Sequence, residues 1–153
     1  MKLELLKLNI EEGGSQSFQF EETSIGDLPG ITLLEPVTGS FVLSNLGIGY
    51  QLSGSFATKV SQPCIRCLDP VIQDVEFDIN EMYLLNAEKD PDQEDVFALE
   101  SDILDVTDIV RQNLLVEVDE FPLCSPDCKG LCPICGANLN KTTCPHQKQL
   151  EEN

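Results

Sequence analysis

Two Cys-x-x-Cys elements constrain this chain more than any other feature of its sequence. They are formed by Cys64 and Cys67, and by Cys132 and Cys135, with Gly136 directly after the second. A gap of two residues lets the backbone fold into a tight knuckle in which both sulfurs reach one ion. Glycine after the second pair suits the left-handed turn that closes such a knuckle. Two knuckles supply four thiolates, so we predict a closed, structural zinc site formed by both pairs.

The spacing between the pairs shapes this prediction. The two elements are separated by 64 residues, which is far more than a compact zinc ribbon contains. The chain is therefore not a standalone zinc finger. Zinc would instead clip the C-terminal tail onto the body of the protein.

Further candidate ligands surround the second knuckle. They are Cys124, Cys128, Cys144 and His146. With the first four they make eight ligands, which is the number needed for two tetrahedral sites. A different grouping places Cys124 and Cys128 with Cys132 and Cys135 on one ion. The sequence leaves the grouping, and the choice between one and two ions, open.

The cellular compartment decides how the cysteines are interpreted. The N-terminal residues interrupt their apolar side chains with charges every two or three positions, unlike the apolar run of a secretory signal. No apolar stretch approaches the length of a membrane helix. We therefore expect a cytoplasmic protein. In a reducing compartment, seven cysteines at short spacings indicate metal ligands before disulfides.

The first half of the chain has the pattern of β structure. Residues 17–21 and 74–79 alternate apolar and polar side chains, which is the period of a half-buried strand. Short apolar or β-prone runs at 31–34, 40–43, 48–52 and 55–60 lie between them, separated by turn residues such as Gly47 and Gly54. We predict an α+β protein whose main element is an antiparallel β-sheet or a partly open barrel.

We predict a single domain over residues 1–153, composed of four consecutive parts. A mainly β body at 1–85 carries the first knuckle, and an acidic loop follows at 86–103, with Glu88, Asp90, Asp92, Glu94 and Asp95 among its carboxylates. A helix at 104–121 is capped by Asp105 or Thr107. Its apolar face packs on the sheet through residues at helical spacing, namely Val106, Ile109, Val110 and Leu114. A cysteine-rich, zinc-binding knuckle tail occupies 122–148.

The net charge of −18 is unevenly distributed. Residues 1–123 contain 24 acidic and 6 basic residues, whereas residues 124–150 contain one acidic and three basic residues. The body should therefore repel nucleic acid. Contact with nucleic acid is expected only near the knuckles, through Arg66, Lys129, Lys141 and Lys148.

Other chemistry is weaker in the sequence. A lone Cys-x-x-Cys can be a dithiol redox motif, and cysteines can also bind iron or iron–sulfur clusters, which colour after aerobic purification would reveal. His146 is the single histidine, so a cysteine–histidine nucleophilic pair would depend on it. No dinucleotide fingerprint, Walker loop or nucleophile elbow is present. We therefore expect no enzymatic activity and no small-molecule substrate.

The order of motifs resembles the bacterial YceD family. The first knuckle continues as Leu68-x-Pro70, and the second lies in Cys-Lys-Gly-Leu-Cys-Pro-x-Cys-Gly over 128–136, followed by Asn138-Leu139-Asn140. The resemblance covers most of the chain from about residue 30. It implies a non-catalytic role in the synthesis, processing or stability of large-subunit ribosomal RNA. It also implies metal binding through Cys64, Cys67, Cys132 and Cys135, with Cys124 and Cys128 as further candidates.

Three classes of function follow from these observations. The first is a ribosome-biogenesis factor that contacts ribosomal RNA, ribosomal proteins of the large-subunit precursor, or both. The second is an acidic adaptor that binds basic ribosomal proteins and uses zinc only to fold. The third is a redox or metal sensor with responsive thiols. We expect no association with a membrane.

Overall fold

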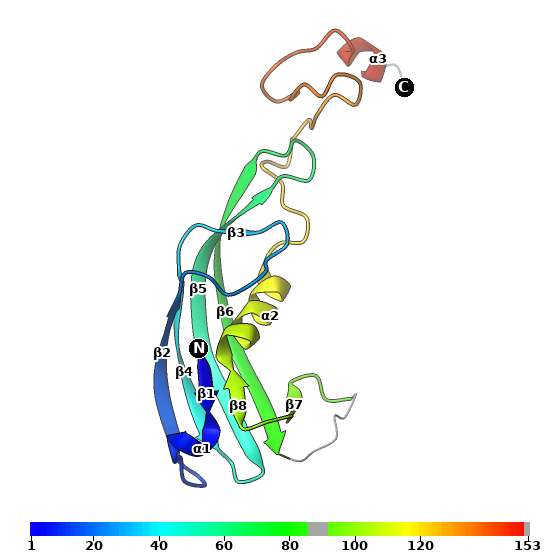
Figure 1. The fold of residues 1–153 in the computed structure, drawn as a ribbon. Helices are drawn as coiled ribbons and strands as arrows, with labels where there is room; N and C mark the ends of the chain where they lie inside the picture. Colours follow the sequence, from blue (N-terminus) through cyan, green and yellow to red (C-terminus); the bar gives the residue numbers. More distant parts are fainter. Residues whose placement is uncertain (86–91, 152–153) are drawn as a thin grey trace.

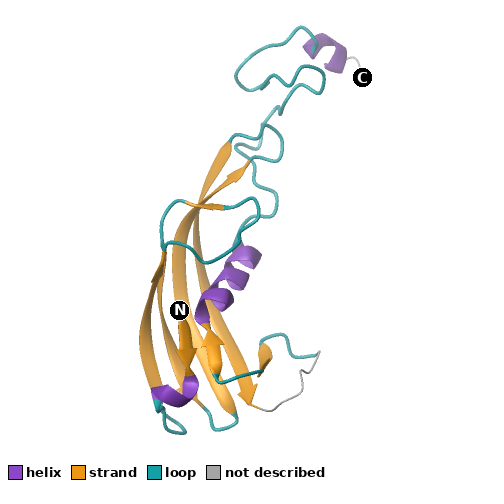
Figure 2. Cartoon of the chain, in the orientation of Figure 1, coloured by secondary structure: helices purple, strands orange, loops and turns teal. Residues whose placement is uncertain are grey.

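A twisted, open β-sheet forms the body of the protein, and a cysteine-rich tail extends from one end of it (Figures 1 and 2). The computed structural model describes residues 1–85 and 92–151. The strands are β1 Lys2–Glu4, β2 Ser15–Glu22, β3 Thr32–Leu33, β4 Val37–Asn45, β5 Gly49–Pro63, β6 Pro70–Leu85, β7 Val96–Leu99 and β8 Ile103–Asp105. The helices are α1 Leu5–Leu8, α2 Val106–Glu117 and α3 Gln147–Glu151.

The order of the main sheet is β2-β4-β5-β6-β7, and β3 pairs separately with β5. Adjacent strands run antiparallel except β6 and β7, which are parallel. A small sheet of β1 and β8 lies beside it. The predicted α+β class, with an open sheet and one main helix in the second half, is confirmed. The parallel pair departs from the wholly antiparallel sheet that we predicted.

The hairpin of β5 and β6 is the longest feature of the sheet. The two strands pair continuously from Gly49 opposite Leu84 to Pro63 opposite Pro70. The prediction of two strands separated at Gly54 is wrong, because Gly54 lies inside β5. A Cβ atom there would lie 2.5 Å from the carbonyl oxygen of Ser40, so glycine lets β4 approach closely rather than ending the strand.

One face of the sheet carries the core. Phe56 lies at its centre, with its ring centroid 5.6 Å from Phe20 of β2 and 5.7 Å from Phe77 of β6. Phe41 of β4 stacks on Phe56 and on Phe18. These contacts follow from the period of two, which places alternate residues of each strand on the same face. They join four strands into one apolar layer.

Helix α2 covers this apolar layer beside β6. Its buried residues are the four predicted from helical spacing, Val106, Ile109, Val110 and Leu114. Asp105 is the N-cap, since its side chain accepts a hydrogen bond from the Asp108 N–H. The helix is shorter than the predicted 104–121, because β8 occupies the residues up to Asp105 and the chain becomes extended at Val118.

The predicted acidic loop contains regular structure. Strand β7 and the first residue of β8 fall within 86–103, and Val96 and Phe97 pair with Met82 and Tyr83 of β6. Glu88 and Asp90 lie outside the described residues, whereas Asp92, Glu94 and Asp95 are exposed. Among the described residues, none of the helices is long and apolar enough to span a bilayer.

The central position of Phe56 generates a stability prediction. Replacing Phe56 with alanine should lower the free energy of unfolding by about 3–5 kcal/mol, because a buried ring is lost and a cavity remains. Val116→Ala is the matched control, since Val116 on α2 is 85% exposed. Its effect should stay within about 0.5 kcal/mol. Denaturant unfolding followed by circular dichroism measures both, and equal effects would contradict the central role of Phe56.

Candidate metal centre

The first knuckle forms the turn of the β5–β6 hairpin. Cys64 follows β5 directly, and its N–H donates to the Asp69 carbonyl at 2.7 Å, while the Leu68 N–H donates to the Cys64 carbonyl at 3.0 Å. Leu68 adopts a left-handed conformation with φ of 65°. These bonds close a tight turn, so both cysteine side chains are buried at the tip of the hairpin.

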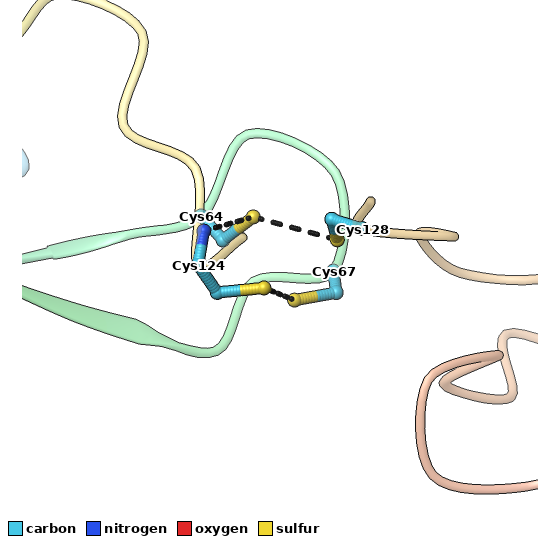
Figure 3. Close-up of side chains that lie close together, drawn as sticks. All are labelled: Cys64, Cys67, Cys124 and Cys128. Carbon is cyan, nitrogen blue, oxygen red and sulfur yellow. Dashed lines mark hydrogen bonds between the residues drawn. The ribbon is translucent and has the colours of Figure 1, made fainter. Parts of the chain in front are cut away.

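The chain after α2 returns to this tip. The Ile65 N–H donates to the Pro122 carbonyl at 3.0 Å, which places the following residues beside the knuckle. The sulfur of Cys128 then lies 3.8 Å from that of Cys64, and the sulfur of Cys124 lies 3.5 Å from that of Cys67 (Figure 3). Two sequence-distant cysteine pairs therefore face one another.

The geometry of this first group fits a tetrahedral metal ion. Sulfurs at about 2.3 Å from a central ion are about 3.8 Å apart along a tetrahedral edge. All four sulfur atoms lie within 4.8 Å of one another, and three of the four residues are buried. The Cys124 N–H and the Asn140 side-chain amide donate to the sulfurs of Cys64 and Cys128, at 3.4 and 3.3 Å. Such donors stabilise thiolates and orient them toward an ion.

The thiols of this group differ in acidity. The Cys67 N–H, helped by those of Cys124 and Arg66, lowers the pKa of the Cys64 thiol to about 6 despite its burial. The pKa of Cys124 is raised to about 12, chiefly by its hydrogen bond with the Cys67 side chain. Without an ion, some of these thiols ionise readily and others keep their protons. A bound cation would remove this conflict by holding all four as thiolates.

A second group lies further along the tail. Cys132, Cys135, Cys144 and His146 place their ligand atoms within 4.8 Å of one another. The Gly136 N–H donates to the Cys132 carbonyl at 2.8 Å, and Gly136 has φ of 75°, as its place after the knuckle predicted. The sulfur of Cys132 lies 4.0 Å from Nδ1 of His146. The Cys135 N–H lowers the pKa of Cys132 to about 6.

The two groups differ in exposure. In the second group only Cys132 is buried, Cys135 is exposed, and Cys144 and His146 are half-buried. The first group is held between the hairpin and the tail, whereas the second is built from the tail alone. The second group is therefore the more accessible to solvent.

Polar side chains join the second group to the hairpin. Asp69 accepts a hydrogen bond from the Asn138 amide at 3.2 Å and forms an ion pair with Lys141 at 3.1 Å. Lys141 lowers the pKa of the Asp69 carboxyl. The side-chain oxygen of Asn140 accepts the Lys129 N–H at 2.8 Å. No role was predicted from the sequence for Asp69, Asn138 or Asn140, although both asparagines lie in the motif that carries the family resemblance.

The predicted grouping of the ligands is wrong. Cys64 and Cys67 gather with Cys124 and Cys128, not with Cys132 and Cys135. The grouping that combined the four cysteines from 124 to 135 is not observed either. The reason is the position of the tail: its first cysteine pair meets the hairpin tip directly after Pro122, so the next knuckle must find its partners further along the chain. All eight candidate ligands fall into two groups of four.

Three of the four residues predicted to contact nucleic acid lie where the tail meets the hairpin tip, and Lys148 lies elsewhere. Arg66 donates to the Cys128 carbonyl at 3.2 Å, and Lys129 follows Cys128. Lys141 is engaged by Asp69, and Lys148 lies in α3 at the far end of the tail (Figure 1). Arg66 and Lys141 thus have intramolecular partners, and the role of all four residues in binding nucleic acid stays a prediction.

Residues 52–153 match the sequence pattern of the family described as large ribosomal RNA subunit accumulation protein YceD. The match begins inside β5 and contains both ligand groups and α2. This chain belongs to the YceD family. The resemblance found in the sequence is therefore confirmed over two thirds of the chain, whereas β1 to β4 lie before the matched region.

Individual relatives are distant. An uncharacterized protein of Mycobacterium tuberculosis is 26% identical over 106 residues, which cover 67% of this chain and 51% of that protein. The maize protein named large ribosomal RNA subunit accumulation protein YCED homolog 1, chloroplastic, is 24% identical over 61% of this chain and 42% of its own length. The uncharacterized protein YlbN of Bacillus subtilis is 27% identical over 77% of this chain and 72% of its own length.

The chain spans about half the length of the mycobacterial relatives that it matches. No solved structure matches it.

The separation into two groups makes a stoichiometric prediction. Elemental analysis after dialysis should find two metal ions per chain. Cys67→Ser should remove the ion of the first group, and Cys144→Ser that of the second, each leaving about one ion per chain. Ser125→Ala is the control, because Ser125 lies between two ligands without offering a thiolate. If either cysteine variant lost both ions, the two groups would not be independent sites.

Proposed function

We propose that this protein is a non-catalytic factor that supports the synthesis, processing or stability of large-subunit ribosomal RNA, and that it holds zinc at both ligand groups. Membership of the YceD family carries the proposal, because the family is named for large ribosomal RNA subunit accumulation. The matched region contains both ligand groups, so the same part of the chain carries the family pattern and the candidate metal centre.

The donor sets support zinc. The first group offers four thiolates, and the second offers three thiolates and one imidazole. Both are ligand sets of structural zinc sites, in which the protein fills all four positions. Zinc bound there would supply no open position for a substrate. In the first group, Asn140 and the Cys124 N–H would orient the sulfurs, and the ion would tie the tail to the hairpin.

A structural role for the metal fits a protein without catalysis. His146, which could serve as a base, lies among the cysteines of the second group. The remaining acidic side chains of the body are mostly exposed. Among the described residues, we find no nucleophile that is hydrogen-bonded to a base oriented by a third group.

A second candidate function is an acidic adaptor for basic ribosomal proteins. The observation that favours it is the uneven charge, with 24 acidic and 6 basic residues before residue 124. Complementary charge accelerates association and selects partners. In this alternative, the protein meets the large-subunit precursor through protein contacts, and ribosomal RNA is affected indirectly.

The proposed role predicts a phenotype. Depleting the protein should lower the ratio of large-subunit to small-subunit ribosomal RNA, measured by quantitative hybridisation. Expression of the native chain should restore the ratio, and Ser125→Ala should restore it equally. Cys67→Ser should fail to restore it, because the tail would lose its attachment to the hairpin. An unchanged ratio on depletion would refute the proposal.

The choice between RNA and protein contacts makes a separate prediction. Because the body repels phosphate, a tagged chain purified at native salt should retain ribosomal proteins after ribonuclease treatment. Lys129→Gln combined with Lys148→Gln should change this retention little. Neither ammonium forms an ion pair within the described part of the chain, so the substitutions leave the fold intact. If ribonuclease treatment released all ribosomal proteins, or if the two lysine substitutions abolished their retention, direct RNA binding would be favoured.

A further inference from the structure

The outer edge of β6 is an unpaired strand edge over most of its length. β5 pairs with β6 along one side from Pro70 to Leu84, whereas β7 pairs with the other side only from Met82 to Leu85. Within residues 1–85 and 92–151, no other backbone group hydrogen-bonds to the outer side of Pro70–Glu81. A strand edge of this kind presents N–H and C=O groups that can pair with another extended chain.

A groove runs along this edge. It has a volume of about 370 Å³ and is lined by Gln73, Asp74, Val75, Glu76, Glu117 and Asp119. Asp74 and Glu76 are exposed and belong to β6, whereas Glu117 ends the helix that covers the core face. The groove therefore lies where the two faces of the sheet meet, beside the unpaired backbone.

The walls of the groove are acidic and poorly neutralised. Asp74 forms an ion pair with Lys59 at 3.7 Å, and Lys59 is also engaged by Glu35 at 3.1 Å. Glu76, Glu117 and Asp119 have no ion-pair partner among the described residues. The groove shares Glu76 and Glu117 with a larger hollow of about 900 Å³, whose lining adds Asp78.

The spacing of the carboxylates on β6 indicates which kind of chain could pair with its outer edge. Asp74, Glu76 and Asp78 alternate along β6 and are all exposed, so they project from one face at intervals of two residues. An added strand has the same period, and its alternate side chains stand opposite these carboxylates. Lysine or arginine at every second position would therefore pair with the row, while small side chains would face α2.

We propose that the outer edge of β6 binds an extended basic segment of a protein partner, which adds to the sheet as a further strand. Backbone pairing with Pro70–Glu81 provides the contact, and the acidic groove selects lysine- or arginine-containing chains. The inference rests on the proposed function only for the setting in which such a partner is met, since basic protein segments accompany ribosomal RNA.

Charge argues against two other occupants. A second copy paired through the same edge would place Asp74, Glu76 and Asp78 near their own counterparts, and like charges facing each other in a sheet are destabilising. Nucleic acid would bring phosphates to unpaired carboxylates. The basic peptide is the occupant that the edge and its charges favour together.

A peptide titration tests the proposal on the full chain loaded with metal. The probe is a fluorescently labelled ten-residue peptide with lysine at alternate positions and threonine between them, followed by anisotropy. We expect saturable binding by this peptide and none by the version with glutamate in place of lysine. Two further peptides carry backbone N-methyl groups on the lysines or on the threonines, which leaves every charge in place.

Only one of the two methylated peptides should lose binding, by more than about tenfold, because alternate N–H groups of an added strand face the sheet. Equal binding by both would show attraction by charge alone and overturn strand addition. The double variant E76Q/E117Q should weaken binding of the unmethylated peptide about fivefold. The control E11Q/E12Q changes the net charge equally in the turn before β2 and should leave binding unchanged.

The remaining outcomes decide between the edge proposal, a homodimer and the proposed function. Equal weakening by both double variants would place the interaction elsewhere and overturn the proposal. A free protein that sediments as a dimer, and whose dimer tightens in E76Q/E117Q because like charges are removed, would assign the edge to a second copy. If peptide binding fails while Cys67→Ser still lowers the ribosomal RNA ratio, the edge proposal falls and the proposed function stands. If depletion leaves the ratio unchanged while the peptide binds as expected, the proposed function falls and the edge proposal stands.

Discussion

The contact between the tip of the β5–β6 hairpin and the returning tail determines the rest of the arrangement. The backbone supplies little there: the Ile65 N–H donates to the Pro122 carbonyl, and the described part of the tail forms no strand with the hairpin. The four facing sulfurs lie at the centre of this contact, and Arg66, Asp69 and Lys141 add polar contacts between the hairpin and the tail. Thiols bury well, but four thiols within 4.8 Å can all be ionised together only if a cation lies among them. The position of the tail therefore depends on which of its cysteines face the hairpin.

The body does not depend on this contact in the same way. Its core is the aromatic layer around Phe56, covered by α2, whereas the sulfurs form a separate buried cluster with Val71, Leu123 and Leu131 around them. Two independent cores imply that metal loss releases the tail before it affects the sheet. The second ligand group is attached to the hairpin through Asp69, Asn138 and Lys141, so its position depends on the first contact although its ligands come from the tail alone.

The sequence predicted what local periodicity and ligand chemistry determine. Alternation located the middle parts of β2 and β6 but not their ends, and helical spacing identified all four buried residues of α2. Local pattern misjudged Gly54, because its role depends on the approach of β4, a neighbour in space. The set of eight candidate ligands was also recognisable from residue type, but their grouping was not. Grouping depends on where the chain meets the hairpin after Pro122, and Cys-x3-Cys is a weaker local signal than Cys-x-x-Cys.

The distribution of charge links the sheet to the tail. Zinc held by four thiolates would keep a formal charge of about −2, so the first group would not turn the junction into a basic surface. Arg66 and Lys141 are each engaged within the junction, which reduces the positive charge available to phosphate. The carboxylates of β6, by contrast, have few internal partners and border a strand edge that the sheet leaves unpaired. Electrostatics and hydrogen bonding thus favour the same occupant at β6, an extended basic chain, and they do so at a site separate from the metal centre.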